Sequence, residues 1–247
     1  MSKEKLHRFF AKTHKWIGLV LGIQLVFWTL GGIVMSWIPI ETVRGEHKIV
    51  GAEPVPLIGY SNLMATGELV KLAEQPVVEV RHMMLLDEPV ARLRLLDDSW
   101  QLRDARSGAL LSPISAAFAQ KIAEADFSLN VPVASVAEIS EASVDYRGTL
   151  PVWQIRFDDS ENSAIYVSPV QARVVARRST VWRFYDFFWM LHIMDYDDRK
   201  DFNNWLLIAT SFFAAMFAMS GFSLLFFRFY RRDFNFILGK KNGQSKA

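Results

Sequence analysis

Two long uncharged apolar stretches dominate the pattern of hydrophobic and polar positions along the chain. They run from Trp16 to Trp37 and from Asn203 to Phe227. About 20 apolar residues, rising about 1.5 Å each, span roughly 30 Å of hydrocarbon, so either stretch can cross a bilayer as a helix. The residues after Trp37 lack the small side chains of a signal-peptide cleavage site. We therefore expect transmembrane helices at residues 16–38 and 203–227.

Between these stretches the pattern changes to β alternation, and it repeats. Residues Val90–Asp98 match Val152–Asp159 at an offset of about 62 residues, and Trp100–Leu111 matches Ala164–Val175 at an offset of about 64. Each copy alternates apolar and polar positions on both sides of a turn that is rich in Asp and Ser. This pattern predicts two β-hairpins, with the Asp side chains bonding to the backbone of the turns.

Helical periodicity precedes each hairpin, over residues 61–74 and 113–125, where Ser112-Pro113 is read as a cap and first-turn pair. The expected fold class is thus an α+β membrane protein. Two transmembrane helices flank an extracytoplasmic domain of two helix/antiparallel-sheet units, at about 60–111 and 112–178.

Charge assigns an orientation to this layout. Residues 1–15 carry a net charge of +4 and residues 228–247 a net charge of +5, which leaves −7 for residues 16–227. Basic flanks are retained in the cytoplasm. We therefore expect cytoplasmic termini, in a bacterial inner membrane, and a periplasmic domain at residues 39–181. The sequence pI of 8.8 averages basic ends and an acidic middle, and gives no support for nucleic-acid binding.

Other chemistry is limited by what the sequence lacks. There is no cysteine, which excludes disulfides and thiol catalysis, and no hydrolase, phosphate-loop or dinucleotide motif.

The histidines near the apolar stretches are the candidate cofactor ligands. His14 precedes two small-residue notches, Gly18/Gly22 and Gly31-Gly32, which admit another helix or a flat cofactor. His192 lies in an interfacial segment, residues 182–202, that is dense in aromatic side chains. A neutral imidazole is a good ligand for haem iron, although packing roles for both histidines stay open.

Two motifs carry a resemblance to a known family, and both contain one of these histidines. They are His14-Lys-Trp16-Ile-Gly18-Leu-Val-Leu-Gly22-Ile-Gln24, continuing to Trp28 and Gly31-Gly32, and Trp189-Met-Leu-His192-Ile-Met-Asp195-Tyr196-Asp197-Asp198-Arg199. They resemble the membrane helices of the PepSY-associated transmembrane family, which includes small two-span haem ferric reductases. The resemblance implies haem b, with His192 and His14 as axial ligands, and a central domain of two PepSY-like units.

Geometry indicates how such ligands would pair. His14 is expected at the cytoplasmic boundary and His192 at the outer one, about 30 Å apart, so one iron does not suit both. A homodimer would pair each histidine with its symmetry mate. Met35, Met190 and Met194 are alternative ligands, and a single tilted site shared by both histidines stays open.

The residues after His192 form a candidate ferric docking site. Asp195, Tyr196, Asp197 and Asp198 offer hard oxygen ligands, which suit Fe³⁺. The alternative is a solvated connection that caps the second span.

The expected function is therefore a haem b ferric reductase that passes electrons outward to ferric iron or a ferric chelate. The Fe²⁺ product would supply a separate ferrous-iron importer. Two alternatives remain: a haem-free, membrane-anchored PepSY protein that binds or regulates a partner, and an electron-transfer subunit for another acceptor.

Overall fold

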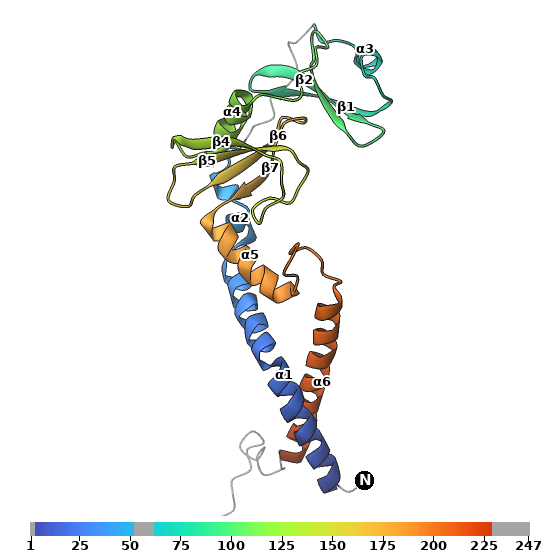
Figure 1. Ribbon diagram of the computed structural model, residues 1–247, viewed down its shortest axis with the longest axis vertical. Coiled ribbons are helices and arrows are strands. Elements are labelled where there is room, and N and C mark those ends of the chain that lie inside the picture. Colours follow the sequence, from blue (N-terminus) through green and yellow to red (C-terminus); the bar gives the residue numbers. More distant parts are fainter. Residues whose placement is uncertain (1–2, 52–61, 229–247) are drawn as a thin grey trace, which may run out of the picture. The chain divides into compact units, whose positions relative to one another are not determined.

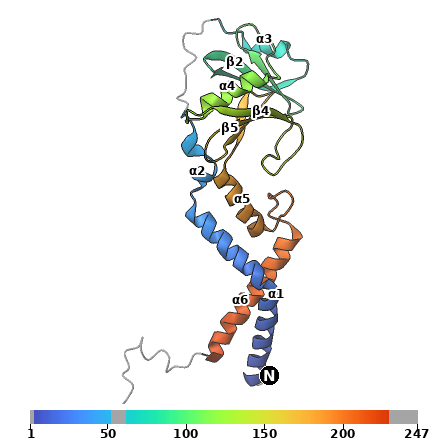
Figure 2. The ribbon, with the colours of Figure 1, turned by 60° about the vertical axis from the view of Figure 1, so that its left-hand side comes forward.

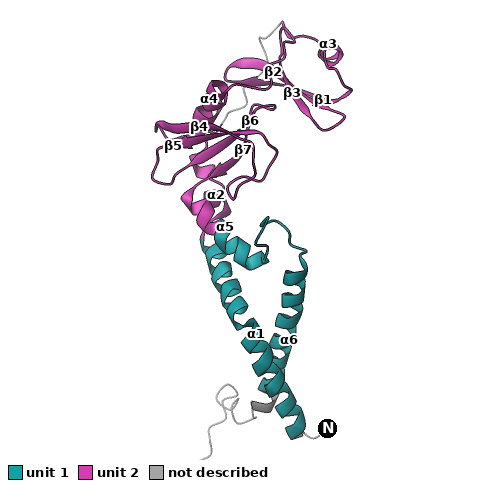
Figure 3. Ribbon diagram, in the orientation of Figure 1, with its two compact units in different colours: residues 1–37, 186–247 teal, residues 38–185 magenta. Residues whose placement is uncertain are grey.

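The computed structural model describes residues 3–51 and 62–228 of the 247-residue chain. The chain divides into two compact units (Figure 3). Unit 1 comprises residues 1–37 and 186–247, and unit 2 comprises residues 38–185. Unit 1 is helical and unit 2 contains two antiparallel sheets, so the predicted α+β class is confirmed.

The long helices of unit 1 are α1 (Lys3–Trp37) and α6 (Trp205–Arg228). The segments Glu4–Trp37 and Trp205–Leu225 are long and apolar enough to cross a membrane. The basic residues before Trp16 do not form a separate element, because α1 already begins at Lys3.

The two long helices meet at a glycine. A Cβ on Gly18 would lie 2.6 Å from the ring of Phe217, so the helices approach closely only because Gly18 has no side chain. Farther along α1 the helices diverge, and the C-terminal end of α5 (Thr180–Ile193) lies between them (Figures 1 and 2). There His192 faces Gly31 of α1.

Unit 2 contains two sheets, and each follows a helix in the sequence. The first has the order β1-β2-β3 and the second the order β4-β5-β6-β7. Their strands are β1 (Val77–Leu85), β2 (Glu88–Leu95), β3 (Trp100–Asp104), β4 (Val133–Ile139), β5 (Val152–Phe157), β6 (Ala164–Ser168) and β7 (Arg173–Arg178). The helices are α2 (Ile40–Val43), α3 (Thr66–Lys71) and α4 (Ala116–Asp126), with a 3₁₀ turn at Glu46–Lys48.

The two sheets repeat the same pairing, which confirms the predicted hairpins. Arg94 pairs with Trp100 in the first sheet, and the positions 62 and 64 residues later, Arg156 and Ala164, pair in the second. The first strand of each sheet also has an irregularity at the equivalent place. It lies between Val77 and Glu79 in β1 and between Val133 and Ser135 in β4.

The hairpin turns repeat the same side-chain bonding. Asp97 accepts hydrogen bonds from the backbone N and the hydroxyl of Ser99, at 3.0 and 2.7 Å. Asp159 accepts the same pair of bonds from Ser163, both at 2.7 Å. The expected role of these aspartates in the turns is therefore confirmed.

The helices cover the sheets through two apolar cores. The larger core joins α4 to both sheets, with Ile122 of α4 packed among Leu102, Ile155 and Ile165. A smaller core lies under α3, where Leu69 packs with Leu93. Since every one of these side chains is nearly fully buried, α3 and α4 are held by tertiary contacts.

The expected start of the second helix is wrong. The α4 helix begins at Ala116 and is capped by Ser115, whose hydroxyl accepts from the backbone N of Phe118. Ser112 instead accepts from the backbone N of Leu102, and Ile114 donates to the carbonyl of Pro169. These bonds keep residues 112–114 out of the helix. The first helix is also shorter than expected, because α3 covers only Thr66–Lys71.

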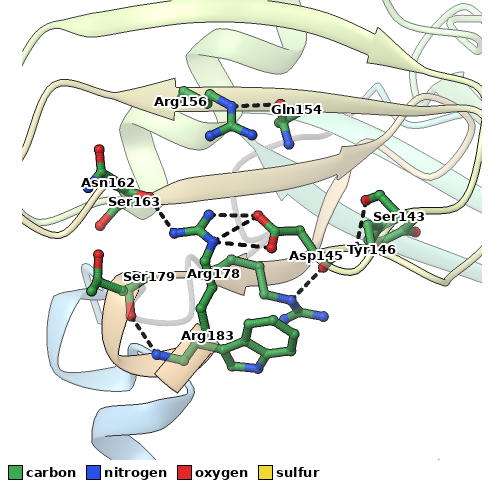
Figure 4. A network of polar contacts seen from close by, with 12 residues as sticks. Ser143, Asp145, Tyr146, Gln154, Arg156, Asn162, Ser163, Arg178, Ser179 and Arg183 are labelled. Atoms are coloured by element: carbon green, nitrogen blue, oxygen red, sulfur yellow. Dashed lines mark hydrogen bonds and ion pairs between the residues drawn. The ribbon is translucent and has the colours of Figure 1, made fainter. Parts of the chain in front are cut away.

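Arginine pairs fix the start of α5 within unit 2. Figure 4 shows the Arg183 guanidinium bonded to both carboxylate oxygens of Asp145, at 2.6 to 3.1 Å. Arg178 donates to the backbone carbonyl of Asp145 at 2.7 Å and lies 4.0 Å from the ring centroid of Trp182. The first turn of α5 is therefore tied to the loop before β5.

Candidate functional site

Side chains from elsewhere in unit 1 donate hydrogen bonds to the carbonyl groups in the last turn of α5. Helix C-termini leave carbonyl groups without partners. Here Gln24 donates to the carbonyl of Leu191 at 3.0 Å, and the Trp28 indole donates to that of His192 at 2.8 Å. The Asn204 amide donates to the carbonyl of Ile193 at 2.9 Å. These three hydrogen bonds fix the backbone of His192.

The loop between α5 and α6 is organised around Asp195. Its carboxylate accepts bonds from four backbone N–H groups, those of Asp197, Asp198, Lys200 and Asp201, at 2.9 to 3.3 Å. The bonds from Asp201 and the other backbone groups hold the pKa of Asp195 below its usual value. Asp195 therefore shapes the loop, and its oxygens are already engaged.

Two further contacts hold this loop to α5. Arg199 forms an ion pair with Asp186, and both side chains are largely buried. The indole of Trp189 donates to the carbonyl of Arg199 at 3.0 Å. Asn204 then begins α6, because its side-chain oxygen accepts from the backbone N of Leu207 at 2.8 Å. These contacts connect the end of α5 to the start of α6 through the loop.

His192 lines a cavity of about 450 Å³ in unit 1. Its other lining residues are mostly aromatic or aliphatic: Trp28, Trp189, Ile193, Phe202, Leu207 and Ser211. The Nδ1 atom of His192 is buried and has no hydrogen-bond partner in the described part of the chain. A Cβ on Gly31 would come within 3.4 Å of that atom, so the glycine makes room for the imidazole.

His14 is held in a different way, by α6. Its Nδ1 lies 3.0 Å from the Ser220 hydroxyl and 3.2 Å from the carbonyl of Phe217, and its ring stacks on the Phe217 ring at 4.1 Å. Because the Ser220 hydroxyl itself donates to the Phe217 carbonyl at 2.7 Å, this network assigns the proton to Nδ1. The lone pair is then on Nε2. A carbonyl or hydroxyl on the far nitrogen is the usual partner of a metal-ligating histidine.

The structure does not bring the two histidines together within one chain. His14 is itself on α1, whereas His192 contacts that helix at Gly31, which is 17 residues farther along. At about 1.5 Å per residue the two places are roughly 25 Å apart. Of the two arrangements considered from the sequence, separate sites fit this geometry and a single shared site does not.

The remaining predicted ligands lie outside the cavity beside His192. Tyr196, Asp197 and Asp198 have exposed side chains in the loop after α5. Within residues 3–51 and 62–228, no group of three or more His, Asp or Glu side chains is placed to hold a metal ion. Met35, Met190 and Met194 are not among the residues that line the cavity beside His192.

The structural roles of several residues in this region were not predicted from the sequence. Gln24 and Trp28 are one helical turn apart within an apolar stretch, so a polar pair on one face of α1 was the available signal. Asn204 lies at the start of the second apolar stretch and is a preferred N-cap residue. For Phe217, Ser220 and Gly221, which surround His14, the sequence offers no local signal.

Comparison of the chain with known protein families, with curated proteins and with solved structures gives no match.

Proposed function

We propose that this chain is a membrane-anchored haem b protein that reduces ferric iron or a ferric chelate to the ferrous state. The observation that carries the proposal is the imidazole of His192 in an aromatic-walled cavity of about 450 Å³ beside two long apolar helices. Cofactor sites are concave and mainly apolar with few polar groups, and this cavity has that character. The resemblance of both histidine motifs to the PepSY-associated transmembrane family adds to this reading.

The residues present fit such a cofactor in two respects. His192 has a fixed backbone and lines the cavity, and its ring packs against Gly31. His14 has its Nδ1 engaged by α6, which leaves Nε2 for a ligand bond. When bound, haem b supplies reversible one-electron chemistry, at a potential set by its axial ligands. Each histidine supplies one ligand, so a homodimer is part of the proposal.

Membrane insertion rests on the surfaces of α1 and α6. Large apolar side chains are exposed along both helices, with Val20 at 79%, Ile23 at 72% and Phe212 at 62% of their full exposure. Such surfaces need lipid or a partner to cover them. In the proposed bacterial inner-membrane topology both termini are cytoplasmic and unit 2 is periplasmic. The exposed Tyr196, Asp197 and Asp198 would then receive ferric iron, and the Fe²⁺ product would pass to a separate importer.

The first test is the visible spectrum of detergent-purified protein, expressed with ample haem, before and after dithionite. We expect a low-spin b-type spectrum that is lost in His192→Ala. His14→Ala reports on the other site, and His7→Ala is the matched control because His7 is exposed on the same helix. Colourless wild-type protein would overturn the haem proposal in favour of a haem-free interaction protein.

The reductase claim needs its own assay. The haem-loaded protein is given a reductant and ferric citrate, and Fe²⁺ is trapped with a ferrous-specific chelator. We expect trapping in wild type and its loss in His192→Ala. Haem-loaded protein that reduces other acceptors but yields no Fe²⁺ would instead identify an electron-transfer subunit for those acceptors.

A further inference from the structure

Three arginines meet on unit 2, far from the histidine motifs in the sequence. Arg81 and Arg92 are directly opposite each other on β1 and β2. The Arg92 guanidinium donates to the carbonyl of Ala172 at 2.9 Å, and the next residue, Arg173, begins β7. Like charges at directly opposed positions of an antiparallel pair are destabilising. Such a pairing therefore needs a compensating interaction.

Nearby carboxylates compensate only part of this charge. Arg81 bonds to Glu79 at 3.0 Å, and Arg94 lies 3.7 Å from Asp98. Neither Arg92 nor Arg173 forms an ion pair with any residue in the part of the chain that the structure describes. Two guanidinium charges therefore remain without a carboxylate.

The Arg92 guanidinium is also incompletely hydrogen-bonded. Its Nε atom is buried and has no partner among the described residues. Burial, followed by the charges of Arg173 and Arg81, lowers the pKa of Arg92 to about 10. The three charges are therefore close enough to act on one another.

A shortage of carboxylates does not explain this arrangement. Residues 38–185 contain 19 acidic and 15 basic side chains. Elsewhere in unit 2 the partly buried Arg177 and Arg183 are matched by Asp126 and Asp145. The buried Arg103 has no carboxylate, but its guanidinium donates to the carbonyls of Gly108 and Leu72 and to the side chain of Gln101. Arg92 differs from Arg103 in that its buried Nε has no hydrogen-bond partner among the described residues.

We propose that Arg81, Arg92 and Arg173 form a binding site for a small oxyanion that carries two or more negative charges. Two uncompensated guanidiniums balance a dianion. The planar fork of a guanidinium matches the oxygens of carboxylates and phosphates. The oxyanion is therefore either a polycarboxylate or a phosphate. The site uses no residue of the proposed haem machinery and its ligand binds without haem.

The test is calorimetric titration of the full-length protein in detergent with citrate and with inorganic phosphate, each against sodium chloride of equal ionic strength. We expect saturable binding of at least one oxyanion, and no heat with chloride. Arg173→Gln should weaken the binding at least about tenfold, since one charged hydrogen-bonding partner is lost. Arg44→Gln is the matched control, because Arg44 is an exposed arginine of the same unit. The preferred anion distinguishes a carboxylate ligand from a phosphate ligand.

A second measurement keeps the proposal falsifiable if binding is weak. Without added oxyanion, Arg173→Gln should raise the thermal midpoint of unfolding because it removes repulsion with Arg92. Equal binding by wild type and Arg173→Gln, or a midpoint that does not rise in that variant, would overturn the proposal. Because neither readout uses haem or iron, failure of the oxyanion proposal does not contradict the reductase proposal.

Discussion

Lys48 is the clearest place to test the energetics of unit 2. Its ammonium lies 2.9 Å from Glu161 and 3.3 Å from Asp159, and the exposed fractions of the Lys48 and Asp159 side chains are only 12% and 5%. Lys48 is the last residue of the 3₁₀ turn after α2, whereas both carboxylates belong to the β5–β6 turn. The perturbation is Lys48→Met, which keeps the apolar stem and removes the charge.

The size of the stability loss depends on the hydrogen bonds that Asp159 keeps in the variant. Removing one partner of a buried ion pair costs about 3–5 kcal/mol. Here Asp159 retains two bonds from Ser163, both at 2.7 Å, and Lys48 is partly exposed. We therefore expect Lys48→Met to lower the free energy of unfolding by only about 2–3 kcal/mol, because Asp159 keeps hydrogen-bond partners.

The pKa of Asp159 determines how the stability loss in Lys48→Met depends on pH. Burial alone would raise the pKa of Asp159, but the bonds from Ser163 and Lys48 outweigh it and hold the pKa below its usual value. A depressed carboxyl pKa contributes stability above the unfolded value of about 3.9, which is lost as the pH falls through the folded value. The difference between wild type and Lys48→Met should therefore be full at pH 7 and should shrink as the pH falls below about 3.9.

The assay is hydrogen exchange in the full-length protein, read at amides of β5 and β6. A change of about 2–3 kcal/mol corresponds to roughly 30- to 150-fold faster exchange at pH 7. Lys121→Met is the control, since Lys121 is exposed on α4 and should change exchange little. Equal exchange in wild type and Lys48→Met at pH 7, or a difference that does not shrink as the pH falls below about 3.9, would refute the ion-pair reasoning.

Two further predictions concern unit 1. Asn204→Ala should destabilise the first turn of α6 by about 2 kcal/mol, measured as faster amide exchange there, because it removes an N-cap and leaves the Ile193 carbonyl without its partner. Unchanged exchange relative to Asn203→Ala would contradict this. Gly221→Ala should displace His14, because the added Cβ would lie 2.9 Å from its ring, whereas Gly22→Ala meets nothing within 4 Å. The readout is the visible spectrum of the haem-loaded protein, and identical spectra for both variants would show that His14 carries no haem ligand bond.

Local pattern accounts for the parts of the fold that the sequence predicts well. The two hairpins follow from alternation over six to eight residues and from Asp-Ser turns, both of which are short-range features. Strands β1 and β4 were not identified. The first ends in the unbroken apolar run Met83-Met84-Leu85, and the second is rich in small residues, so neither alternates clearly.

The surroundings of the histidines depend on distant contacts instead. His14 and Ser220 are 206 residues apart in the sequence, and Trp28 and His192 are 164 apart. No window of the sequence contains both partners of either pair. The sequence therefore indicates which imidazoles to consider and that they lie far apart, whereas the caps and the cavity come only from the folded chain.

The capping of α5 by α1 has a consequence for biogenesis. Gln24 and Trp28 leave the ribosome about 165 residues before the carbonyls that they satisfy. Because a ribosome adds about 5–20 residues per second, α1 exists for roughly 10–30 s before α5 has been synthesised. During that time its amide and indole groups have no α5 to bind, so any factor that shields nascent apolar helices has an interval in which to act on this one.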